Sequence, residues 1–185
     1  MKKVCISIIA GLALTGQAAA GYNDFFNQGY VGLSYAALEQ DDRFFGEDRL
    51  ETGELLIRLV GNINEYFSSE LRVGATVDDN KDTLADDQTE AEFRHNYLAS
   101  GFLRLGYPLF ANFTPYVAAG YTWGEERLEA EGASTSRSTF DDWSFAAGID
   151  IDLGERLGLN IEATEYYNIG SVALRGPSAG LYWRF

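Results

Sequence analysis

Apolar side chains alternate with polar or small ones along eight separate segments of this chain. In the second segment, for example, the odd positions carry Leu55, Ile57 and Leu59, and the even positions include Glu54 and Arg58. A period of two puts successive side chains on opposite faces of a strand, whereas a helical face repeats about every 3.6 residues. The pattern therefore predicts an all-β fold with eight strands. The expected strands are residues 29–38, 53–62, 66–77, 96–107, 114–124, 142–153, 157–166 and 172–185.

The two faces of these strands differ in kind, which indicates where each face points. The even-numbered face carries charges of both signs and the odd-numbered face carries the large apolar residues. Aromatic residues gather at the ends of the apolar face, with Trp123 and Trp143 at one level and Tyr107, Trp183 and Phe185 at the other. A membrane barrel has its polar face inside and aromatic girdles outside, the inverse of a soluble barrel. We therefore expect an antiparallel transmembrane β-barrel, closed because an open edge in hydrocarbon leaves backbone groups unpaired.

The connections between segments alternate in length. Short ones lie near 63–65, 108–113 and 154–156, and long acidic ones near 39–52, 78–95 and 125–141. Short periplasmic turns opposite long extracellular loops are typical of outer-membrane barrels. The last outer connection, near 167–171, is short, and Gly176-Pro177 interrupts the eighth segment. At that pair we expect a bulge or a late strand start.

The first twenty residues read as a secretion signal that is removed from the mature protein. Lys2 and Lys3 precede an apolar stretch, residues 4–14, and Ala18-Ala19-Ala20 provides a small-residue cleavage site. The stretch is shorter than the ~20 residues that a spanning helix needs. Cys5, the sole cysteine, lies inside it, so the mature chain has no thiol. We expect residues 21–185 to form a single barrel domain.

The charge of the chain excludes one class of partner. The net charge is −14, and cleavage after Ala20 removes two lysines and no acidic residue, which leaves −16. Nucleic-acid binding requires Lys and Arg to meet the phosphates. We therefore expect no nucleic-acid partner.

Three stretches resemble a known family. Residues 29–35, GYVGLSY, look like the opening strand of the small outer-membrane β-barrel proteins, which include the membrane domain of OmpA and the OmpX/Ail group. Residues 114–121, TPYVAAGY, resemble the fifth strand of that porin-like superfamily. The ending, Leu181-Tyr182-Trp183-Arg184-Phe185, is similar to its C-terminal assembly signal. The resemblance implies location in the outer membrane and recognition of Leu181, Trp183 and Phe185 by the barrel-assembly machinery.

The inward charges predict a polar network across the lumen. A three-residue turn centred on Asn64 would set Arg58 opposite Glu70, with Arg72 as its diagonal neighbour. Either the network is a packed plug that holds the strands together, or the lumen conducts or holds a ligand; eight strands leave an interior just wide enough for side chains. The expected members are Arg58, Glu70, Arg72, Arg104, Asp150, Glu162 and Arg184.

Neither catalysis nor a metal site is indicated. Some outer-membrane barrels of this size are lipid A deacylases, which use a His with a Ser two residues later. In this chain the sole histidine is His95, and the residue two positions later is Tyr97. The acidic run that starts at Asp78 has Thr83 where a calcium loop needs Gly, and Thr89 where it needs a bidentate Glu. We expect no enzyme activity, cofactor or bound metal.

The acidic loops are the remaining candidate for function. We expect a monomeric, non-enzymatic outer-membrane protein with a structural or surface-interaction role, surrounded by membrane lipid and lipopolysaccharide. Divalent cations that bridge loop carboxylates to lipid phosphates are one hypothesis; loops kept soluble and extended by charge are the other. The alternatives are a small transport or ligand-binding barrel, a lipid A-modifying enzyme, and a soluble periplasmic binder. The loop acids are Glu39, Asp41, Asp42, Glu47, Asp48, Asp78, Asp79, Asp82, Asp86, Asp87, Glu90, Glu92, Glu125, Glu126, Glu129 and Glu131.

Overall fold

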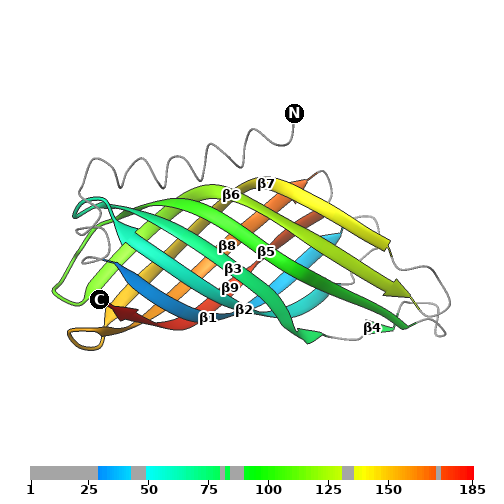
Figure 1. The fold of residues 1–185 in the computed structure, drawn as a ribbon, viewed down its shortest axis with the longest axis horizontal. Coiled ribbons are helices and arrows are strands. Elements are labelled where there is room, and N and C mark those ends of the chain that lie inside the picture. Colours follow the sequence, from blue (N-terminus) through cyan, green and yellow to red (C-terminus); the bar gives the residue numbers. More distant parts are fainter. Residues whose placement is uncertain (1–28, 43–48, 80–81, 84–89, 131–135, 170–171) are drawn as a thin grey trace.

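The chain forms a closed antiparallel barrel of eight long strands and one strand of two residues (Figure 1). The computed structural model describes residues 29–42, 49–79, 82–83, 90–130, 136–169 and 172–185. The eight-stranded prediction is confirmed, while the predicted signal peptide lies outside the described residues. Among the described residues, no helix is long and apolar enough to cross a membrane. The strands are β1 (Tyr30–Asp42), β2 (Arg49–Asn62), β3 (Phe67–Asp79), β4 (Asp82–Thr83), β5 (Glu90–Gly106), β6 (Phe113–Ala130), β7 (Ser136–Asp152), β8 (Leu157–Ile169) and β9 (Val172–Arg184).

The barrel closes between its first and last strands. Ser34 of β1 pairs with Gly180 of β9, and every other long strand pairs with its neighbours in sequence. Starting from Ser34, the paired residues lead to Gly124 of β6 through β2, β3 and β5, and to Thr114 of β6 through β9, β8 and β7. The register is therefore staggered by ten residues around the barrel, the difference between positions 124 and 114 on β6. Such a stagger accompanies strands tilted about 35–45° to the barrel axis. Figure 1 shows strands that run obliquely to the long axis of the barrel.

The two faces point as the alternation predicts. Ile57 on the outer face is 58% exposed, while its neighbour Arg58 is 1% exposed inside the barrel. Large apolar residues are likewise exposed on the outer face of every long strand, including Trp143 and Trp183 near its two ends. An apolar outside around a charged inside is stable in hydrocarbon and not in water. This inversion rules out the soluble-binder alternative.

The turn between β2 and β3 corrects the predicted register. It covers four residues, 63–66, and Asn64 caps it by accepting hydrogen bonds from the backbone N–H groups of Tyr66 and Phe67, both at 2.8 Å. The last paired positions are Asn62 and Ser68, so the partner of Arg58 moves by two residues along β3 from the predicted register. Arg58 therefore faces Arg72 and not Glu70, which is the diagonal neighbour.

The expected loops at 39–52, 78–95 and 125–141 are partly strand, because all the strands that border them extend into these ranges. The extension is longest in β5, β6 and β7. The β5–β6 ladder extends to Ala91 and Ala130, and the β6–β7 ladder to Leu128 and Ser136. Figure 1 shows β5, β6 and β7 reaching past the rest of the barrel at the end opposite the short turns. Outside the bilayer both faces of a strand can be polar, so the alternation that marks a membrane strand fades while the backbone pairing continues.

The predicted bulge or late start at Gly176-Pro177 is wrong in position. β9 begins earlier, at Val172, and the register shift lies on β8 between Glu165 and Tyr167. The two residues pair with β8 but not with β1, because Pro177 has no N–H to donate. Gly176 is required by close approach, since an added Cβ would lie 2.9 Å from the carbonyl carbon of Ala37.

Candidate functional site

A closed ring of four charged side chains fills the middle of the lumen. Glu70 joins Arg58 and Arg72, with Nε–Oε1 distances of 2.6 and 2.9 Å. Glu162 joins the same two arginines from the opposite wall, with 3.0 Å to Arg58 Nη2 and 2.6 Å to Arg72 Nη1. All four side chains are at most 1% exposed. Charge therefore alternates around the ring, so that each guanidinium meets two carboxylates.

A second cluster extends the ring toward the short-turn end. Arg104 donates to Asp150 Oδ2 at 2.6 Å and lies 3.5 Å from Glu70 Oε2. Its guanidinium also stacks over the Tyr116 ring, 3.6 Å from the centroid. The cluster adds one charge of each sign, so the three arginines and three carboxylates of the network balance. Buried charge is tolerated only when paired and hydrogen-bonded in this way.

Neutral polar side chains complete the hydrogen bonding of the network. Tyr116 donates to Glu162 at 2.6 Å, and Thr164 donates to the same carboxylate at 2.6 Å. Asn160 accepts from Arg58 and donates to Asp150 at 2.7 Å. The network is thus continuous from β2 and β3 across the lumen to β7 and β8.

Two apolar layers enclose this polar layer. On the loop side lies a buried cluster of inward-facing side chains from six strands. On the short-turn side Tyr30 stacks on Tyr182, with ring centroids 4.4 Å apart, next to Val60. The lumen is therefore packed at three successive levels. The loop-side cluster consists of Ala36, Leu38, Leu56, Leu98, Phe140, Tyr166, Tyr167 and Leu174.

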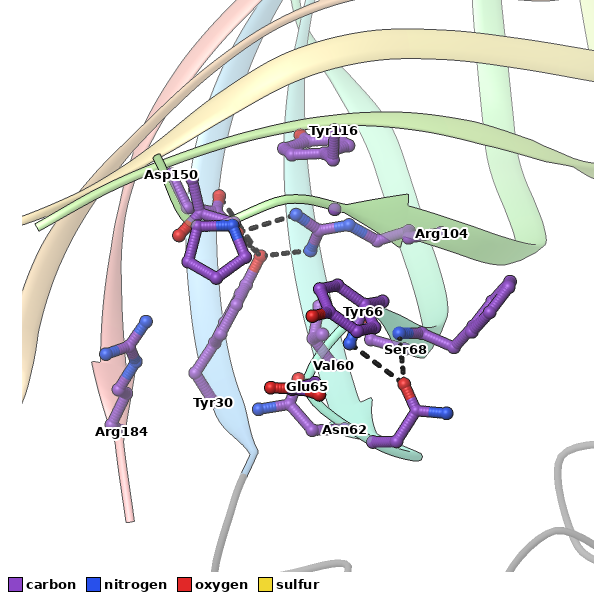
Figure 2. A pocket seen from close by; sticks show the side chains of 15 residues that line it. Tyr30, Val60, Asn62, Glu65, Tyr66, Ser68, Arg104, Tyr116, Asp150 and Arg184 are labelled. Carbon is purple, nitrogen blue, oxygen red and sulfur yellow. Dashed lines mark hydrogen bonds and ion pairs between the residues drawn. The ribbon is translucent and has the colours of Figure 1, made fainter. Parts of the chain in front are cut away.

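A small vestibule of about 280 Å³ opens below the network at the short-turn end (Figure 2). Figure 2 shows Arg104, Tyr30 and Asp150 joined at its inner end, with Glu65 and Arg184 nearer the mouth. Its inner lining includes Tyr30, Arg104, Tyr116 and Asp150, which belong to the packed side chains of the network.

The whole fold matches one known protein family. Residues 6–185 match the family model described as outer membrane protein beta-barrel domain. The chain belongs to this family. It is an outer-membrane β-barrel protein, and the short-turn end is therefore the periplasmic end.

Solved structures agree on the fold. The attachment invasion locus protein Ail of Yersinia pestis is 11% identical, with a TM-score of 0.66 over 86% of this chain and 99% of that chain. Neisserial surface protein A is 13% identical, with a TM-score of 0.66 over 85% and 97%. The N-terminal barrel of Pseudomonas aeruginosa OprF is 13% identical, with a TM-score of 0.58 over 85% and 100%. No curated protein matches the sequence.

Within this barrel, six of the seven predicted lumen residues lie in one connected network. The exception is Arg184, which lies at the periplasmic rim and pairs with Asp152 at 2.8 Å. Its side chain is 39% exposed, and Asp152 also accepts from Tyr182 at 2.6 Å. Arg184 is the last residue of β9 and pairs with Tyr30, the first residue of β1. It therefore lies at the periplasmic end of the barrel, away from the ring. The six connected residues are Arg58, Glu70, Arg72, Arg104, Asp150 and Glu162.

Sequence reasoning missed the neutral and apolar parts of the lumen. A signal for them existed, since Leu56, Leu98, Phe140 and Leu174 are large apolar residues at even-numbered, inward positions. Within the part of the chain that the structure describes, no group of three or more acidic, His or Cys side chains could hold a metal ion. His95 belongs to β5 beside a register shift; its side chain lies outside the described set.

Proposed function

We propose that this outer-membrane barrel is a non-enzymatic surface-interaction protein that binds cationic partners through its extracellular acidic strands and loops. The observation that carries the proposal is the packed lumen, which leaves the outer end of the barrel as the place where function can act. A transport role would need a continuous bore, and three layers of buried side chains fill it.

The extracellular sheet of β5, β6 and β7 supplies the binding surface. It extends beyond the apolar band as far as the β6–β7 pair Leu128 and Ser136. The β7–β8 ladder ends at Phe145 and Glu165, and beyond it β7 contacts β8 through side chains, as where the Asn168 N–H donates to Asp142 at 2.9 Å. The outermost part of β7 continues past these contacts to Ser136. An extended sheet with an accessible edge offers backbone and side-chain contacts to another molecule.

The charge on this surface selects the class of partner. The outer ends of β5, β6 and β7 carry three arginines, Arg94, Arg127 and Arg137, which are paired neighbours across the strands. The sequence sets seven acidic residues against them: Glu90, Glu92, Glu125, Glu126, Glu129, Asp141 and Asp142, and Glu131 follows β6 in the sequence. Such a field attracts cations and repels the anionic membrane surface around it. It therefore favours a basic peptide or protein over another lipopolysaccharide molecule.

Binding of a decalysine peptide to the barrel in lipid nanodiscs tests the proposal. Replacing the four glutamates at 125, 126, 129 and 131 by glutamine should weaken binding about tenfold, since each exposed ion pair contributes about 0.3 kcal/mol. The matched control changes the periplasmic-turn residues Glu65 and Glu155 to glutamine and should bind like the native protein. Equal binding by the native and fourfold variants would overturn the proposal.

We propose no catalytic role for the chain. Lipid A deacylases of this size use a histidine with a serine two residues later, whereas His95 of this chain is followed at that position by Tyr97. The test is the mass of lipid A in cells that produce the native protein.

A further inference from the structure

A second surface lies on the lipid-facing wall and is independent of the acidic sheet. A groove of about 530 Å³ runs over β7, β8 and β9. Its floor includes Ala147, Ala163 and Pro177, which are paired neighbours across the three strands and all point outward. Because these three side chains are small, they leave a depression in the wall of the barrel. The larger side chain of Phe145, which is 55% exposed, borders this depression. We call this depression the lipid groove.

A row of alternating charge borders the lipid groove on its extracellular side. Glu165 of β8 pairs with Arg175 of β9, and Arg175 pairs with Glu39 of β1. All three side chains line the groove, and Arg175 is exposed. Neighbouring strands lie about 4.8 Å apart, so the three charged groups follow one another at the spacing of adjacent strands. Each of the three lies two residues from a small outward residue of the same strand, on its extracellular side.

The location of the groove determines what can fill it. The wall below the charged row carries apolar outward residues such as Ile161 and Leu181, which are 47% and 52% exposed. In an outer-membrane barrel this wall contacts acyl chains. The occupant therefore has an acyl chain for the row of small residues and a headgroup at the level of Arg175.

We propose that the lipid groove binds one molecule of lipid A that carries phosphoethanolamine. Its acyl chain lies over Ala147, Ala163 and Pro177, its phosphate meets Arg175, and its ammonium group meets Glu165 or Glu39.

The order of the charges argues for this headgroup. An unmodified lipid A phosphate gains one guanidinium but lies between two carboxylates, which repel it. A headgroup with both phosphate and ammonium pairs with charges of both signs in the row, which is the charge complementarity that selects one partner over another. The row should thus prefer the modified lipid to the unmodified one.

Native mass spectrometry of the folded, full barrel tests this proposal. The probes are lipid A with and without phosphoethanolamine, matched in their acyl chains. The native barrel should retain the modified lipid at least fivefold more strongly. Arg175→Gln should lose most of the binding of the modified lipid, and Ala163→Phe, which fills the groove, should lose binding of both lipids.

Two control variants match these changes elsewhere on the surface. Arg156→Gln removes an exposed arginine at a periplasmic turn, and Ala75→Phe adds the same ring to the exposed outer face of β3. Both should bind like the native barrel. Equal retention of the two lipids by the native barrel would overturn the proposal, as would native-like binding by Arg175→Gln or Ala163→Phe. The acidic-sheet proposal is tested with a peptide and a different set of residues, so the two can fail separately.

Discussion

Arg58 and Arg72 face each other directly across the β2–β3 ladder inside the barrel, and the same two carboxylates hold both. Like charges opposite each other in a ladder are destabilising by themselves. Glu70 from the same wall and Glu162 from the facing wall offset the repulsion between the two arginines. Glu162 can do so because the interior is narrow enough for a side chain to reach the opposite wall. The ring therefore links strands that are not neighbours.

Removal of one carboxylate from the ring should destabilise the barrel. Glu162→Gln leaves Arg58 and Arg72 with one carboxylate between them in a buried site. We expect the free energy of unfolding to fall by about 3 to 5 kcal/mol, the usual cost of breaking a buried ion pair. Urea unfolding in lipid vesicles, followed by the gel shift between folded and unfolded protein, measures it. Glu155→Gln in an exposed turn is the control and should change stability by less than about 0.5 kcal/mol; an equal effect of both variants contradicts the ring's role.

The closing seam between β1 and β9 should be sensitive to a single methyl group. A Cβ added at Gly180 would lie 2.6 Å from the Cα of Ser34 on the paired strand. We expect Gly180→Ala to lower the free energy of unfolding by about 1 to 3 kcal/mol through overpacking. At Gly154, in a periplasmic turn, no atom lies within 4 Å of an added Cβ. Gly154→Ala should leave the urea midpoint unchanged, and a seam variant as stable as this one would show that the strands do not close as described.

The C-terminal residues should control assembly more than stability. Trp183 and Phe185 point outward at the periplasmic end and are 50% and 49% exposed. We predict that Phe185→Ala lowers the amount of folded protein in the outer membrane severalfold, because the resemblance of this ending to a C-terminal assembly signal implies that the assembly machinery recognises it. The variant refolded in detergent should keep its urea midpoint. Tyr35→Ala, which removes an exposed outward aromatic from β1, is the control, and equal membrane levels of both variants would refute the assignment.

Expression of the native protein should leave lipid A chemically unchanged. We expect identical lipid A mass spectra from cells that produce the native protein, His95→Ala or no barrel at all. A mass change present with the native protein and lost with His95→Ala would show catalysis.

The alternation of side chains was enough to predict the strands, their inward and outward faces and six members of the charged network. These depend on a local rule, the period of two, which holds wherever one face meets lipid. The register of Arg58 was not predictable, because it depends on a four-residue turn capped by the side chain of Asn64. The outer ends of β5, β6 and β7 were missed because the alternation of apolar and polar residues fades there in the sequence.

The lumen shows the same limit. Ionic residues at inward positions are conspicuous in a sequence, but Tyr116 and Asn160 join the network through contacts between distant strands. Only the ten-residue stagger brings those strands to the same level, and no local pattern encodes it.

Conductance across a planar bilayer tests the packed lumen most directly. We predict that the purified native barrel shows no steady conductance. Glu162→Gln should also remain closed, because the apolar layer around Leu56 and Phe140 and the stacked pair Tyr30 and Tyr182 still fill the lumen above and below the ring. Large, stable channels in the native protein would contradict the packed lumen and restore transport as its function.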